Sequence, residues 1–297
     1  MIYLIIVSLI WAFSFGLIKG NLTELDASFV AFARLFISFL FFAVFLRIKP
    51  FKFRQLGKLM AIGAIQFGLM YIFYIYSYGF LKAWQIALFT IFTPLYVTLI
   101  NDILNKKFNP RFLLAALLSI IGAGIIVFNE GHDLHLKTGF ILMQLSNICF
   151  AAGQVFYKRI RKSFEDIKDV SLFAWVYSGA FLISLLNTLI VTDYSAIHLN
   201  STRIYTLLYL GILASGICFF LWNFGAIKVN AGTLAVFNNL KVPLGVAASI
   251  FVFNEVGGFV KMLLGGVIIA GALFISEHFN ARIQNPAGEK ENLRSPG

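Results

Sequence analysis

Hydrophobic residues along the chain gather into ten long runs separated by short polar stretches. The runs lie at residues 2–18, 29–46, 59–80, 83–103, 111–128, 138–157, 171–191, 204–227, 231–253 and 259–279. A helix needs about 20 apolar residues to cross a bilayer, and it satisfies its own backbone hydrogen bonds there. The alternating strands of an outer-membrane barrel are absent from the sequence. The pattern therefore predicts an all-α membrane protein with ten transmembrane helices.

The composition agrees with a protein embedded in a membrane. The chain has 297 residues, of which 60% are hydrophobic and 12% charged, and its mean hydropathy is +0.86. A soluble domain carries about 25% charged residues. This chain therefore has too little polar surface to be a soluble enzyme, a DNA-binding domain or a disordered protein. The exception is the polar segment 281–297, which is expected to be a disordered cytoplasmic tail.

The 24 Lys and Arg residues predict the orientation of the helices. If the N-terminus is cytoplasmic, 17 of them fall in the inner loops and the tail, five fall in the outer loops, and two lie within the runs. Because cytoplasmic loops carry an excess of Lys and Arg, both termini are expected in the cytoplasm. The net charge of +11 is then a feature of membrane topology, and no nucleic-acid partner is expected.

The two halves of the chain share short motifs in the same order. Residues 93–95 read Thr-Pro-Leu, residues 242–244 read Val-Pro-Leu, and the offset between them is 149. We therefore expect two five-helix domains, at residues 1–128 and 137–279. Because five is odd, the second domain enters the membrane from the opposite side, which makes an inverted repeat. Secondary transporters built from such repeats bind substrate near the midplane, between the halves.

Pro94 and Pro243 are the paired interruptions of this repeat. Proline lacks the backbone N–H and clashes with the carbonyl four residues earlier, so it breaks or kinks a helix. We interpret the pair as helix breaks that either gate the substrate path or only bend packed helices.

Two cationic side chains, Arg34 and Lys241, lie within predicted helices. Lys241 stands ten residues into its run, about 15 Å deep at 1.5 Å per residue, near the midplane of a hydrocarbon core about 30 Å thick. Arg34 lies about 8 Å deep and either extends its side chain to the surface or binds substrate. None of the 13 acidic residues stands mid-run. Because a buried cation alone is costly, this pattern favours a carboxylate-bearing substrate as its partner.

Amide and aromatic side chains gather in the same helices. The further candidates for substrate binding are Asn147, Asn223, Asn238 and Asn239, which can bind a polar neutral group, and the aromatic residues Tyr96 and Trp222. Hydrogen bonds between helices and packing are the alternative roles. The four His residues lie in loops or at helix ends, so no metal site, catalytic set or cofactor is expected.

Nine segments of the chain carry a family resemblance. They are residues 89–103, 121–126, 144–148, 157–159, 173–182, 214–217, 222–226, 231–234 and 238–245, the last reading Asn-Asn-Leu-Lys-Val-Pro-Leu-Gly. On these segments the chain resembles the EamA-like branch of the drug/metabolite transporter superfamily over residues 2–280, and within it the biotin importers of bacteria. The resemblance implies biotin uptake across the inner membrane by alternating access. It also implies that the carboxylate binds Lys241 or Arg34 and the ureido ring binds the asparagines. The sequence departs from the expected pattern at Lys241, where the resemblance implies a histidine.

Other functions stay open on the sequence. An exporter of amino acids or other carboxylated metabolites in the same superfamily would have the same helices, because an inverted repeat works in both directions. A membrane-embedded enzyme would need a catalytic set near the interface, where only Asp102, Glu255 and loop histidines stand. The expected partners are a small-molecule substrate and the lipid bilayer. We expect a monomer, because ten helices can form a closed arrangement.

Overall fold

The computed structural model describes residues 2–48, 51–106, 134–164 and 167–228, together with 241, 244–245, 248, 251–254, 267 and 271. Every regular element in these residues is helical. The elements are α1 (Ile2–Asn21), α2 (Ala27–Ala43), α3 (Phe53–Gly63), η1 (Ala64–Leu69), α4 (Met70–Ser77), α5 (Ala83–Phe89), η2 (Thr90–Phe92), α6 (Thr93–Leu104), α8 (Leu134–Arg161), α9 (Asp169–Val191), η3 (Tyr194–Ala196), α10 (Ser201–Tyr209), η4 (Leu210–Ile217) and α11 (Cys218–Ala226). Helix follows helix without a turn in three places: α3–η1–α4, α5–η2–α6 and α10–η4–α11.

Six of the described helices are long and apolar enough to cross a membrane. They are Ile2–Asn21, Phe53–Ser77, Ala83–Leu104, Leu134–Arg161, Asp169–Val191 and Ser201–Ala226. The helix α2, with 17 residues, is shorter. These seven helices coincide with seven of the ten predicted runs. The other three runs, 111–128, 231–253 and 259–279, lie wholly or mostly outside the described residues.

Helix starts differ from the predicted runs where polar residues begin the helix. The run predicted to start at residue 59 belongs to a helix that begins at Phe53, because the Gln55 side chain accepts the backbone N–H of Lys52 at 2.9 Å. The run predicted to start at 204 begins at Ser201, where Asn200 accepts the N–H of Arg203 at 2.8 Å. Side-chain acceptors of this kind satisfy the free N–H groups of a first turn.

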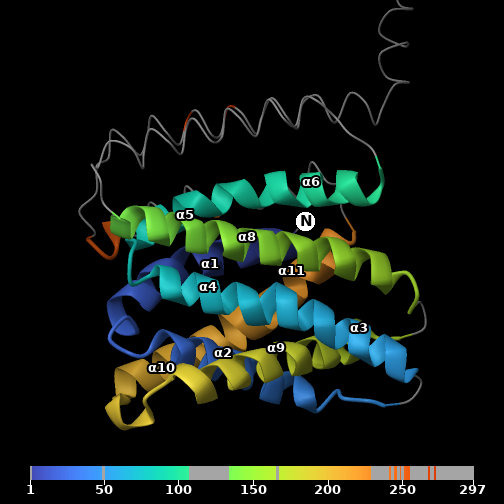
Figure 1. Cartoon of the computed structure of the whole chain (residues 1–297), viewed down its shortest axis with the longest axis horizontal. Coiled ribbons are helices and arrows are strands. Elements are labelled where there is room, and N and C mark those ends of the chain that lie inside the picture. Colours follow the sequence, from blue (N-terminus) through green and yellow to red (C-terminus); the bar gives the residue numbers. More distant parts are fainter. Residues whose placement is uncertain are drawn as a thin grey trace, which may run out of the picture.

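The described helices lie side by side in one bundle (Figure 1). Helices from the first half of the chain pack on helices from the second half, including α2 on α9, α4 on α8, α6 on α8 and α1 on α11. Glycines allow the closest approach, between α3 and α9. A Cβ on Gly63 would lie 1.7 Å from the carbonyl oxygen of Val176, and one on Gly179 would lie 1.9 Å from that of Met60. Small residues at helix contacts are typical of membrane bundles.

Three described segments within longer helices depart from α-helical geometry. Both η1 and η4 are π-helical, and their first residues, Ala64 and Leu210, are 146 positions apart. The third segment, η2, is a 3₁₀ turn that ends two residues before Pro94. Such irregular turns within longer helices often mark functional sites. Pro243, the predicted counterpart of Pro94, lies outside the described residues.

Polar contacts join the two halves of the chain at one end of the bundle. Asp26 accepts the backbone N–H of Phe29 at the start of α2, at 2.9 Å, and the hydroxyl of Thr192 at 2.5 Å. Arg203 at the start of α10 forms an ion pair with Glu24. The loop before α2 is therefore tied to the end of α9 and to the first turn of α10.

Candidate binding cavity

A cavity with about 550 Å³ of empty space, part of it open to solvent, lies between α1, α2, α4, α8, α11 and the α5–α6 helix. Its lining residues are Trp11, Ser14, Phe15, Arg34, Met70, Tyr71, Tyr74, Thr90, Thr93, Met143, Ser146, Asn147, Phe150, Phe219 and Lys241. Most are apolar or aromatic, with a few polar groups among them. Small-molecule sites have this volume and this balance of side chains. Both halves of the chain contribute to the wall.

Arg34 is held in the cavity wall by side chains from two other helices. It is 2% exposed. Its Nε donates to the Ser215 hydroxyl at 3.2 Å, and its Nη2 donates to the Tyr71 hydroxyl at 2.8 Å. The guanidinium carbon also lies 4.5 Å from the centre of the Tyr71 ring. Of the two alternatives open on the sequence, extension to the surface is therefore wrong, because the side chain faces the bundle interior.

The residues that hold Arg34 contact the π-helical segment η4. The hydroxyls of Tyr71 and Ser215 lie 2.9 Å apart. The Tyr177 hydroxyl donates to the backbone carbonyl of Ser215 at 2.5 Å and to that of Gly216 at 3.1 Å. Tyr177 thus satisfies carbonyls of the irregular segment and fixes the residue that binds Arg34.

One nitrogen of Arg34 keeps its hydrogens available. Among the described residues, Nη1 has no hydrogen-bond partner although it is buried. Buried polar atoms are nearly always paired, so an unpaired one needs an explanation. None of the buried polar side chains that the structure describes is a carboxylate. The free nitrogen can therefore bind an anionic group that enters the cavity.

Lys241 is held differently, by aromatic rings. It is 5% exposed, and its Nζ lies 5.1 Å from the ring centre of Trp11, 5.7 Å from that of Phe150 and 5.9 Å from that of Trp222. Aromatic faces attract a cation at such distances. The indole N–H of Trp11 donates to the carbonyl of Ala214 at 2.9 Å, which fixes one of these rings.

Asn147 is placed in the cavity by the helix break before Pro94. Since Pro94 has no N–H to give to the Thr90 carbonyl, that carbonyl accepts the N–H of Thr93 in a 3₁₀ turn. The carbonyl of Phe89, one residue earlier, accepts the Asn147 Nδ2 at 2.8 Å, and the Thr93 hydroxyl donates to the Asn147 Oδ1 at 3.2 Å. The break thus supplies a carbonyl that orients the Asn147 amide.

The structure brings together some of the predicted site residues and not others. Arg34, Asn147 and Lys241 line the cavity. Trp222 and Asn223 are buried one helical turn beyond Phe219 and do not line it. Tyr96 donates to Gln144 at 3.1 Å and is also outside the lining. Asn238, Asn239 and Pro243 lie outside the described residues.

The hydroxyl groups of the site were not predicted from the sequence. Tyr71 and Ser215 support Arg34, and Ser14, Ser146 and Thr90 line the cavity. Hydroxyls are common in membrane helices and often bond to the carbonyl four residues earlier, as Ser14 does with Ile10 at 2.9 Å. The one available signal was the position of Thr90 and Thr93 beside the paired proline. Among the described residues, no group of three His, Cys, Asp or Glu side chains is arranged to hold a metal ion.

Comparisons with known proteins agree with this architecture. The model of the EamA-like transporter family matches residues 1–128 and again residues 137–277. A biotin transporter of Escherichia coli K12 is 36% identical over 277 residues, which cover 93% of this chain and 92% of that protein. A probable biotin transporter of Pseudomonas aeruginosa is 37% identical over 276 residues, covering 92% of this chain and 96% of that protein. A solved structure, described only as "Crystal structure of protein", is 14% identical with a TM-score of 0.65, covers 92% and 95% of the two chains, and indicates the fold alone.

Proposed function

The chain belongs to the EamA-like transporter family, and we propose that it imports biotin. As a member of this family it is a transporter and not an enzyme. The observation that carries the proposal is the 36–37% identity to biotin transporters over more than nine-tenths of each chain. The competing export of amino acids or other carboxylated metabolites has no comparable support.

The cavity has chemistry suited to each part of biotin. The valerate carboxylate would bind the free Nη1 of Arg34, with Lys241 as a second nearby cation. Charge-assisted hydrogen bonds from a guanidinium to a carboxylate are short and strong. The apolar bicycle would lie against Phe150 and Phe219, and the ureido group would bind the amide of Asn147.

The path through the membrane follows from two inverted repeats of five helices, at residues 1–128 and 137–279. This proposal is supported by the two matches of the family model, 1–128 and 137–277, and by the two π-helical segments at an offset of 146. Alternating access would consist of rocking one repeat against the other around the cavity. Pro94, and Pro243 in the second repeat, would be the helix breaks about which the wall rearranges.

We further propose that the protein lies in the inner membrane of a bacterium with both termini in the cytoplasm. The bacterial relatives and the excess of Lys and Arg in alternate loops support this orientation. The ten helices would close around the path, so a monomer would suffice for transport. Asn238 and Asn239, three and two residues before Lys241 in sequence, are proposed to contact the substrate with it.

Uptake of radiolabelled biotin tests the proposal. The host is a biotin-requiring bacterium that lacks its own biotin transporter, supplied with low external biotin. Saturable uptake that unlabelled biotin competes with is the expected result. Correctly inserted protein that gives no uptake would contradict biotin import, and loss of preloaded amino acids from the same cells would favour the exporter instead.

A further inference from the structure

Four buried polar side chains form a group beside the cavity, here named the amide cluster: Gln66, Gln154, Trp222 and Asn223. Gln66 Nε2 donates to Asn223 Oδ1 at 3.1 Å, and the indole N–H of Trp222 donates to Gln154 Oε1 at 3.2 Å. All four side chains are at most 5% exposed. None of them lines the cavity, so the proposed site leaves this cluster without a role.

Two hydrogen-bonding atoms of the amide cluster are unmatched. Among the described residues, the acceptor Gln66 Oε1 and the donor Gln154 Nε2 have no partner. Fully buried polar atoms are nearly always satisfied, and an exception asks for a missing ligand or water. One donor and one acceptor together complement a neutral amide or urea, which presents N–H and C=O groups side by side.

The amide cluster lies one helical turn from the cavity on three separate helices. On α8, Gln154 follows the lining residue Phe150 by four positions. On α11, Trp222 and Asn223 follow the lining residue Phe219 by three and four. On the α3–η1–α4 helix, Gln66 precedes the lining residue Met70 by four. These spacings keep each residue on the face of its cavity neighbour.

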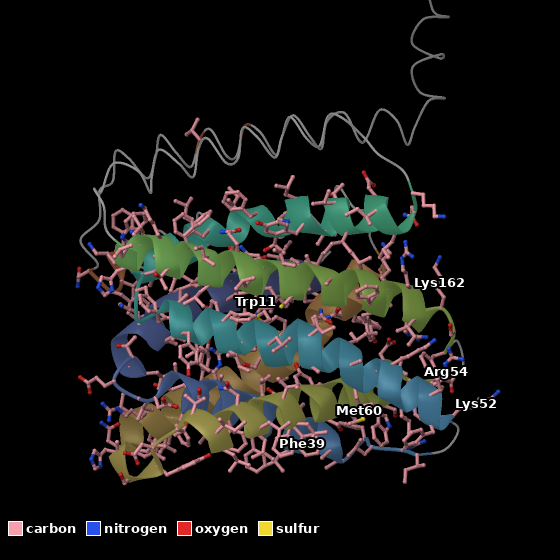
Figure 2. All side chains as sticks on the ribbon, in the orientation of Figure 1. Trp11, Phe39, Lys52, Arg54, Met60 and Lys162 are labelled. Carbon is pink, nitrogen blue, oxygen red and sulfur yellow. The ribbon has the colours of Figure 1, made fainter. Side chains whose placement is uncertain are left out.

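All three displacements point toward the basic end of the bundle. The last turn of α8 carries Lys158, Arg159 and Arg161. Figure 2 shows Lys52, Arg54 and Lys162 at this same end, with Trp11 near the middle of the bundle. The positive-inside rule makes such an end cytoplasmic. The amide cluster therefore lies between the cavity and the cytoplasm.

A layer of aromatic rings separates the cavity from the amide cluster. The ring of Trp11 lies 4.8 Å from that of Phe219 and 5.1 Å from that of Trp222, and the rings of Phe150 and Phe219 are 5.4 Å apart. Trp222 belongs both to the aromatic layer and to the amide cluster, because its ring contacts Trp11 while its N–H donates to Gln154. Rotation of these rings would connect the cavity to the amide cluster.

The backbone around the amide cluster is closely packed and contains a π-helical segment. Gln66 lies in the π-helical segment η1, a geometry often found at functional sites. A Cβ on Gly153 would lie 2.1 Å from the Cβ of Gln66. Any larger residue at 153 would therefore displace the Gln66 side chain.

We propose that the amide cluster is a second binding station on the transport path, selective for a neutral urea or amide. It receives the ureido group of the substrate as the substrate leaves the cavity across the aromatic layer toward the cytoplasm. Gln66 Oε1 accepts a substrate N–H, and Gln154 Nε2 donates to the substrate carbonyl. This inference rests on the proposed import of biotin and adds a step to it.

The test separates binding in the cavity from passage through the amide cluster. Gln66→Met and Gln154→Met keep the side-chain length and remove the polar atoms. In proteoliposomes each is expected to lower the maximal rate of biotin uptake about three- to tenfold, the effect of one neutral hydrogen bond. Equilibrium binding of biotin to the purified protein in detergent should stay within about twofold of wild type. The two substituted side chains lie one helical turn away from the cavity, so the cavity lining is unchanged.

A second readout separates recognition from a structural role. Uptake of 2-iminobiotin, in which a guanidine replaces the urea, is measured beside that of biotin. Wild type is expected to transport biotin faster, and both glutamine variants should lose part of that preference. Gln85→Met is the matched control, because Gln85 is equally buried but its oxygen already accepts the N–H of Lys82 at 2.8 Å. It should keep the wild-type rate and preference.

The outcomes distinguish the two levels of the proposal. Wild-type protein that transports no biotin would overturn both the function and the station. Wild-type uptake with unchanged rates and unchanged preference in both glutamine variants would overturn the station alone. Reduced rates with an unchanged preference for biotin over 2-iminobiotin would assign the cluster a structural role and also overturn the inference.

Discussion

Two buried cations share the cavity, and their surroundings differ. Arg34 is fixed by hydrogen bonds to Ser215 and Tyr71 and keeps one nitrogen unpaired. Lys241 instead lies over the faces of Trp11 and Phe150. A guanidinium held in one orientation is preorganised for a planar carboxylate. An ammonium over aromatic faces is stabilised without a fixed direction. Arg34 is therefore suited to anchoring the substrate, and Lys241 to setting the charge of the cavity.

Removing the Arg34 charge is expected to have the largest effect. Arg34→Met should raise the KM for biotin uptake roughly 10- to 100-fold, the equivalent of about 1.5–3 kcal/mol for a hydrogen bond to a charged group. Arg34→Lys should recover part of the loss, because it restores the charge without the planar fork. Initial uptake rates over a range of biotin concentrations measure both. A KM for Arg34→Met within twofold of wild type would show that the anchor lies elsewhere.

Removing the Lys241 charge should have a smaller effect on transport and the opposite effect on stability. Lys241→Met should raise the KM about three- to tenfold, the equivalent of about 0.7–1.4 kcal/mol, because an ammonium without a fixed direction contributes less than a hydrogen bond from a held guanidinium. It should also raise the unfolding temperature, because an apolar side chain replaces a desolvated charge among aromatic rings. Thermal unfolding of the purified variant and of wild type in detergent measures the direction of this change in unfolding temperature. A lower unfolding temperature would mean that Lys241 has an anionic partner.

Removing one hydrogen bond to Arg34 should raise the KM less than removing the charge of Arg34 does. Tyr71→Phe deletes the hydroxyl that accepts from Nη2 and keeps the ring under the guanidinium. The KM for biotin should rise about two- to tenfold, corresponding to about 0.5–1.5 kcal/mol for one hydrogen bond. Tyr76→Phe on the same helix is the control, since Tyr76 bonds to Ser28 away from the cavity. Equal effects of the two variants would contradict a specific role for Tyr71.

A cation outside the cavity, in an ion pair with an exposed partner, should matter least. Arg203 pairs with Glu24, whose side chain is 81% exposed. Exposed ion pairs contribute about 0–1 kcal/mol, so Arg203→Gln should change the free energy of unfolding by no more than that and leave the KM within about twofold. The same uptake and unfolding assays apply. A loss of uptake comparable to that of Arg34→Met would mean that burial does not distinguish the two arginines.

The sequence predicted the membrane helices well because their apolar runs are long. Seven predicted runs coincide with described helices, since lipid requires about 20 apolar residues per crossing. Helix starts were less predictable, as Phe53 shows, because polar residues in the first turn hide a start from an apolar pattern. The π segments were also missed, since Gly68 and Gly216 within them look like ordinary small residues.

The site was predictable where a residue type is rare in membranes and not where it is common. Arg34 and Lys241 stood out because charges within spans are rare. Tyr71 and Ser215 did not, because their meeting with Arg34 depends on helix contacts across 37 and 181 positions. Trp222 was predicted to bind substrate and lies one turn beyond the cavity. Angular spacing along a helix determines the face of a residue but not where the cavity ends.

The most direct test of the carboxylate anchor compares binding of biotin with that of biotin amide, which lacks the negative charge. Equilibrium competition against radiolabelled biotin is measured for purified wild type and Arg34→Met. We expect wild type to bind biotin at least about tenfold more tightly than the amide, as one charged hydrogen bond implies. We expect Arg34→Met to lose most of this preference, and the remainder to come from Lys241. A preference for biotin that persists undiminished in Arg34→Met would contradict the assignment of Arg34 as the anchor.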